Sequence, residues 1–161
     1  MNRRERLGIT KDQAHGLELL AIYLMNLPED YDEFDMEHFM EITNPNSRNT
    51  LYAQSKPVCG AVACSMGHAP LLARIKGDAF KMFKPLGDER WNEYSFRVFG
   101  AVVADALWSW CFSAYWKGLD NTPKGAGQRI LYALKHGLPS TQSRFSQLNG
   151  AEKLCYTNIK G

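Results

Sequence analysis

Residues 101–116 read AVVADALWSWCFSAYW, a stretch whose single charged residue is Asp105. Placed on a helix, it is apolar on nearly every side, and a helix of that kind lies in the interior, wrapped by others. We therefore predict a central helix over 101–116. The expected fold class is mainly α, a single compact multi-helix domain built around this apolar central helix.

Helices are also predicted on the N-terminal side of this stretch. Thr10 and Gln13 have the spacing of a capping box and precede leucines at helical intervals, which predicts a helix over about 11–26 that Pro28 ends. A short helix is expected from Asp35 to Ile42. Small residues over 58–75 predict another helix, which Pro70 should break or kink because proline has no N–H to donate.

On the C-terminal side, Asp88 is expected to cap a helix that ends before Gly100. Thr122 and Pro123 have the pattern of a helix start, and Gly137 that of a helix end. No period-two alternation predicts a strand. We divide the chain into a basic N-terminal tail (1–10), a helical core domain (11–139) and a polar C-terminal segment (140–161).

Composition limits the compartment and the class of protein. The chain of 161 residues contains no apolar run long enough to cross a bilayer and no signal-peptide pattern at its start. Its four cysteines are too sparse for a disulfide framework and are expected to be reduced thiols. The expected location is the cytoplasm, without membrane attachment.

Charge is unevenly distributed along the chain. Residues 29–41 contain seven acids and no Lys or Arg, whereas the rest of the chain carries 19 bases against the other 10 of its 17 acids. This acidic stretch also contains aromatic residues of the kind that anchor interfaces. The candidate partner-binding residues are Tyr31, Glu33, Phe34 and Asp35. Ordinary solvated faces remain the simpler explanation of such a charge run.

Cys59, Cys64 and His68 form a C-x4-C-x3-H pattern inside the small-residue stretch. Zinc would need a fourth ligand, and no spacing in the sequence selects one. A cysteine nucleophile with a histidine base is conceivable but has no flanking signature. Thiols and His68 packed into the core are the favoured interpretation, so no cofactor is expected unless these residues bind zinc.

A candidate anion site lies at the predicted helix start near residue 122. Free amides there, beside basic side chains and glycines, suit a phosphate group. The candidate ligand-binding residues are Thr122, Lys124, Gly125 and Arg129. The glycines at 125 and 127 have a second explanation, because they would also admit a neighbouring helix.

Lysines at 81 and 84 interleave with Phe80 and Phe83, as in some nucleic-acid-binding stretches. The phenylalanines are three residues apart, which fits one buried face with lysines at its rim. The formal net charge of the chain is +2, below the excess typical of nucleic-acid binders. Nucleic acid is therefore an unlikely partner on sequence grounds.

Several motifs together resemble those of small uncharacterised proteins of tailed bacteriophages and prophages, which share a CGxxACxxGH stretch. The resemblance covers about residues 15–139. In this chain the motifs are Leu27-Pro28-Glu29-Asp30-Tyr31, Phe34-Asp35-Met36, CGAVACSMGHAP at 59–70, Phe99-Gly100, Trp108, Trp110, and DNTPKGAGQRI at 120–130 with Tyr132. The resemblance implies a phage accessory protein that acts in the cytoplasm of an infected cell.

The expected function is a non-enzymatic binding protein that counteracts host defence or redirects a host factor. It would capture either a host protein or a small phosphate-bearing, nucleotide-like ligand. The alternatives are a thiol or metal-dependent enzyme built on the Cys and His residues, and a minor virion structural protein. Homo-oligomers are also compatible with the sequence.

Overall fold

The computed structural model describes residues 3–28, 31, 65–75, 77–102, 105–112 and 122–138. Within these ranges the chain forms six α-helices and one 3-10 helix, and contains no strand. The predicted class, a compact all-α fold, is confirmed. In chain order the helices are α1 (Arg3–Leu7), α2 (Lys11–Met25), α4 (Ser65–Ile75), η1 (Gly77–Phe83), α5 (Trp91–Phe99), α6 (Ala106–Phe112) and α7 (Pro123–His136).

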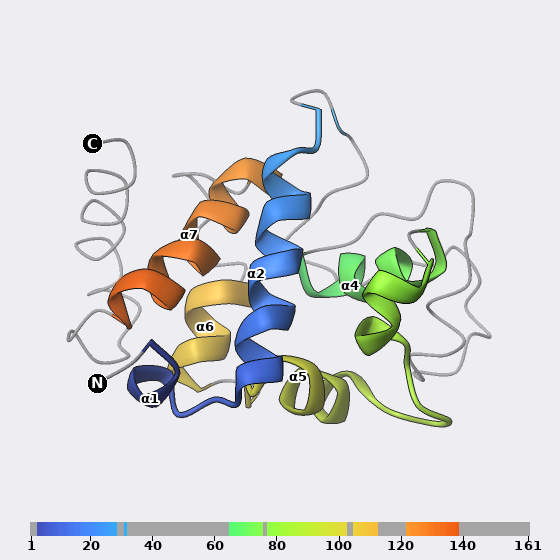
Figure 1. Cartoon of the computed structure of the whole chain (residues 1–161), viewed down its shortest axis with the longest axis horizontal. Coiled ribbons are helices and arrows are strands. Elements are labelled where there is room, and N and C mark those ends of the chain that lie inside the picture. The colour runs from blue at the N-terminus through green and yellow to red at the C-terminus, as the bar shows by residue number, and fades with distance from the viewer. Residues whose placement is uncertain are drawn as a thin grey trace.

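Helix α2 runs through the middle of the described fold, with α7 on one side and α4 on the other (Figure 1). It packs against α4, α5 and α7, whereas α1 packs against α7. The buried side chains of α2 are Leu17, Leu20, Ala21 and Leu24, which recur at helical spacing on one side of the helix.

The predicted capping box starts α2. The backbone amide of Gln13 donates to the Thr10 hydroxyl (3.2 Å), and the Thr10 amide donates to Gln13 Oε1 (2.9 Å). The side-chain amide of Gln13 also reaches α5, because its Nε2 donates to the carbonyl of Phe96 (2.9 Å). One residue therefore caps the start of α2 and binds a carbonyl at the end of α5.

Helix α7 begins and ends where the sequence predicts. Thr122 is extended and its hydroxyl accepts from the Gly125 amide (3.1 Å), while Pro123 occupies the first turn. Gly137, with a φ of 80°, follows the last helical residue. Both signals are local, which is why they can be recognised in the sequence.

The predicted cap of α5 is wrong. Helix α5 starts at Trp91 after the extended residue Arg90, not after Asp88. Glu93 provides the capping contact instead, because its carboxylate accepts from the Arg90 amide (2.9 Å). Gly100 is left-handed (φ 69°) and ends the helix, as predicted.

The central apolar stretch starts its helix later than predicted. The described part of it is α6, which begins at Ala106, because a turn from Val102 to Asp105 precedes it. Leu107, Trp110, Cys111 and Phe112 are buried, as expected for an internal helix, whereas Val102 is 46% exposed.

Pro70 does not end the helix that contains it. Helix α4 continues from Ser65 to Ile75 with Pro70 inside it. Every residue from Ser65 to Pro70 is buried. The backbone hydrogen bond that Pro70 cannot donate is therefore missing within a packed segment, and the helix continues past it.

Hydrogen bonds connect the helices from α7 back to α4. Trp110 Nε1 on α6 donates to the carbonyl of Arg129 on α7 (2.8 Å), and the Ser65 hydroxyl on α4 donates to the carbonyl of Cys111 on α6 (3.3 Å). Phe83, Phe99 and Phe112 fill the space between η1, α5 and α6, with ring centroids 5.9 and 5.3 Å apart.

Two predicted boundaries concern the ends of the chain. The segment 1–10 contains α1 and the buried Ile9, so it is attached to the core. The short helix expected from Asp35 to Ile42 and the polar segment 140–161 lie outside the described residues.

Gly127 should be intolerant of any side chain. A Cβ there would lie 2.7 Å from the carbonyl oxygen of Ala21 and 2.6 Å from Met25 Cγ. We expect overpacking in Gly127→Ala to cost about 1–3 kcal/mol and the better helix propensity of Ala to offset about 1 kcal/mol of it, so the free energy of unfolding should fall by up to about 2 kcal/mol.

Urea unfolding measures this effect, and Gly16→Ala is the comparison. At Gly16 the nearest backbone atom, the carbonyl oxygen of Val98, would be 3.1 Å from the new Cβ, so the loss should be smaller. A Gly127→Ala protein as stable as the wild type would show that α7 can move away from α2 at little cost.

Candidate functional site

Tyr31, the described residue of the acidic stretch, lies against His68 of α4. The Tyr31 hydroxyl is 3.2 Å from His68 Nε2, and the two rings meet edge to face with centroids 5.7 Å apart. Tyr23 of α2 also contacts the His68 ring, at 6.3 Å between centroids. Two motifs that the sequence separates by 37 residues therefore meet at one histidine.

His68 is 1% exposed, so the contact joins Tyr31 to a buried ring. Tyr31 itself is half-buried. The structure places Tyr31 against α4, and its predicted role in partner binding stays a prediction. The other predicted partner-binding residues, Glu33, Phe34 and Asp35, lie outside the described residues.

The candidate metal set is described only at His68. Cys59 and Cys64 lie outside the described residues, and within the described part of the chain no three His, Cys, Asp or Glu residues group closely enough to hold a metal ion. A metal ion at Nε2 of His68 would compete with the Tyr31 hydroxyl. The described part of the stretch 59–70, Ser65 to Pro70, is buried, and the Ser65 hydroxyl donates to the Cys111 carbonyl of α6.

The four candidate anion-binding residues do not gather at one surface. The Thr122 hydroxyl already accepts from the Gly125 amide, and Gly125 is buried. Lys124 is exposed, whereas Arg129 is 2% exposed. Five residues apart on a helix corresponds to about 140° of rotation, so the two cations point in different directions.

Phe80 and Phe83 form the single buried face that the sequence favoured. Phe83 is fully buried, Phe80 is half-buried, and their ring centroids are 5.9 Å apart. Lys81 and Lys84 are exposed at its edge.

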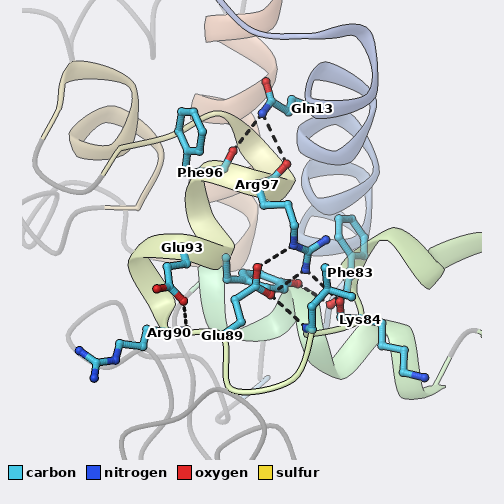
Figure 2. Close-up of polar contacts among 10 residues, drawn as sticks. Gln13, Phe83, Lys84, Glu89, Arg90, Glu93, Phe96 and Arg97 are labelled. Carbon is cyan, nitrogen blue, oxygen red and sulfur yellow. Dashed lines mark hydrogen bonds and ion pairs between the residues drawn. The ribbon is translucent and has the colours of Figure 1, made fainter.

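An ion pair that the sequence did not predict connects the loop before α5 to that helix. Arg97 Nε lies 2.6 Å from Glu89 Oε2, and Arg97 Nη2 lies 2.8 Å from Glu89 Oε1 (Figure 2). Arg97 also donates to the carbonyl of Lys84 (3.0 Å), and Glu89 accepts from the Leu86 amide (3.2 Å). The geometry is bidentate, and Glu89 is 8% exposed.

Tyr94 lies beside this pair. Its hydroxyl donates to the carbonyl of Phe83 (2.6 Å), and the Arg97 guanidinium is 5.5 Å from the centre of its ring. Burial raises the pKa of Tyr94 well above its ordinary value of 10, although the positive charge of Arg97 lowers it in part. The Glu89 carboxylate raises the pKa of Arg97 by its hydrogen bond. Every group of this cluster is engaged within the fold, which makes it a structural element.

Sequence spacing does not predict the ion pair of this cluster. Glu89 and Arg97 are eight residues apart and lie on different sides of the helix start, so no helical i to i+4 rule applies to them. The pairing of Tyr31 with His68 has no sequence signal, because it depends on how α2 and α4 pack.

No family model, curated protein or solved structure matches this chain. None of the helices in the described ranges is both long and apolar enough to cross a membrane.

Replacing Tyr94 by Phe should reveal its raised pKa. Because the folded state holds the Tyr94 proton more tightly than the unfolded chain, the stability that Tyr94 contributes decreases as the pH rises above about 10. Tyr94→Phe loses the bond to the buried Phe83 carbonyl, which should cost about 1–2 kcal/mol near neutral pH.

Urea unfolding across the pH range gives the measurement. The wild type should be the more stable protein up to about pH 10, and its advantage over Tyr94→Phe should shrink at higher pH. An advantage that stays constant through the alkaline range would mean that Tyr94 ionises equally well in both states.

Proposed function

We propose that this protein is a non-enzymatic binding protein that captures a protein partner through its acidic stretch, residues 29–41. The resemblance to phage proteins suggests that this partner is a host factor. The observation that supports the proposal is the contact of Tyr31 with the buried His68. It attaches the beginning of the acidic stretch to the helical core.

The contact matters because it holds one residue of the stretch, Tyr31, against α4. A binding segment loses less conformational freedom on association when part of it is already held in place. The seven acids in the stretch would then face a basic groove on the partner, where charge complementarity speeds association and selects the partner. Phe34 supplies an aromatic side chain of the type found at the centre of interfaces.

The competing version, phosphate binding at the start of α7, is less well supported. Arg129 is buried, and the Gly125 amide is used by the Thr122 cap. Gly127 has a packing explanation, because α2 occupies the space where its side chain would be.

Charge reversal within the acidic stretch tests the proposal. We expect Glu33→Lys with Asp35→Lys to reduce recovery of the partner from host lysate by at least about tenfold, since like charges across an interface cost several kcal/mol. Quantitative mass spectrometry of proteins captured on the tagged full-length chain gives the measurement. The matched control is Glu18→Lys with Asp88→Lys, which changes the same charge at two exposed sites elsewhere.

The result would contradict the proposal if the Glu33 and Asp35 variant captured the same proteins as the wild type. Equal loss in the control variant would point to net charge alone. A variant of Tyr31 adds a separate readout: Tyr31→Ala should weaken capture more than Tyr31→Phe, because Phe keeps the ring contact with His68.

A further inference from the structure

The first and last described helices bring positive side chains together at one end of the molecule. Helix α1 packs against α7, and the Arg6 side chain lies next to Gly137. A Cβ added at Gly137 would be 3.7 Å from both Cβ and Cδ of Arg6. Lys135 and His136 occupy the last turn of α7. Arg6, Lys135 and His136 are all exposed.

The two helices are strongly biased toward positive charge. Among the side chains of α1 and α7 that the structure describes, Arg6, Lys124, Arg129 and Lys135 are basic and Glu5 is acidic. Arg129 is buried and Lys124 is in the first turn of α7, so Arg6 and Lys135 are the cations at this end. The neighbouring helices add the exposed acids Asp12 and Glu18 on α2, and Asp105 precedes α6. The net charge of +2 conceals this bias, because seven of the acids of the chain belong to residues 29–41.

Aromatic rings lie beside these cations. The His136 ring packs on the Tyr132 ring at 4.8 Å between centroids, with an angle of 37° between the planes. Tyr132 in turn packs on the buried Trp110 at 5.7 Å. The column begins in the core and ends at an exposed ring, so its outermost member is rigidly supported and has a solvent-facing position.

We infer that this surface, made of Arg6, Tyr132, Lys135 and His136, binds single-stranded nucleic acid. The cations from two helices suit successive phosphates, and the supported ring suits an unpaired base. A duplex keeps its bases stacked inside and so cannot use the ring. Cations near the end of α7 also interact with the helix dipole, but the dipole does not account for the exposed His136 ring packed on Tyr132.

The test is binding of the full-length protein to a fluorescently labelled single-stranded oligonucleotide of about 20 nucleotides, long enough to span a typical single-strand site. Fluorescence anisotropy at several salt concentrations gives affinity and its salt dependence. We expect Arg6→Gln with Lys135→Gln to lower the slope of log K against log salt by about 1.4, because each phosphate contact in a single strand contributes about 0.7.

His136→Ala should weaken binding by about tenfold through loss of base stacking and should leave the duplex affinity unchanged. Lys81→Gln with Lys84→Gln is the matched control for the two charges removed, since both lysines are exposed. Helix η1, which contains Lys81 and ends one residue before Lys84, lies on the far side of α2 from α7 (Figure 1). All these side chains are at the surface, and circular dichroism would verify that each variant is folded.

Three results would overturn the inference. The first is no binding of the oligonucleotide at low salt. The second is equal affinity for the single strand, the duplex and polyglutamate, which would mean attraction to any polyanion. The third is an equal loss of affinity in Lys81→Gln with Lys84→Gln and in Arg6→Gln with Lys135→Gln. None of these measurements depends on the acidic stretch, so they are separate from the test of partner capture.

Discussion

The close approach of α7 to α2 at Gly127 is the contact on which the described fold depends. With no side chain at this position, the backbone of α7 lies against the Ala21 carbonyl and Met25 of α2. That placement brings the Arg129 carbonyl within hydrogen-bond distance of Trp110 on α6, and the Cys111 carbonyl of α6 accepts from the Ser65 hydroxyl of α4. Since α4 also packs on α2, the four helices contact one another in a ring. A shift at any one interface therefore strains the others, as expected in a closely packed interior.

A second set of contacts fixes the last turn of α5. Arg97 in this turn pairs with Glu89 of the loop that precedes the helix, and Gln13 of α2 binds the neighbouring Phe96 carbonyl (Figure 2). Exposed ion pairs contribute little to the free energy of unfolding. This pair should contribute more, because Glu89 is largely buried and the geometry is bidentate. The pair also lies beside Tyr94, whose buried hydroxyl keeps its proton.

The length of α2 separates Tyr31 from the cations of α1 and α7. Tyr31 is six residues beyond the C-terminal end of α2, whereas α1 and the end of α7 lie near its N-terminal end (Figure 1). A helix of 15 residues is about 22 Å long, which exceeds the Debye length of about 10 Å at moderate salt.

Local signals made much of the fold predictable. Thr10 with Gln13, Thr122 with Pro123, and Gly100 with Gly137 mark helix limits that the structure confirms, because caps and left-handed glycines depend on neighbouring residues. Asp88 failed as a cap because Glu93 provides the contact from inside the helix. The predicted helix over 101–116 begins too early, because the apolar pattern includes Ala101 and Val102, which are not helical, and α6 begins at Ala106, after Asp105.

The candidate sites were less predictable than the helices. The sequence determined by itself the mainly α class, the caps of α2 and α7, the acidic stretch and the burial of Leu107, Trp110, Cys111 and Phe112. Only the tertiary structure decided that Arg129 is buried, that Tyr31 meets His68, and that Arg6 lies beside the end of α7. The physical reason is range: capping and periodicity act within one or two helical turns, whereas these contacts join residues that the packing of separate helices brings together.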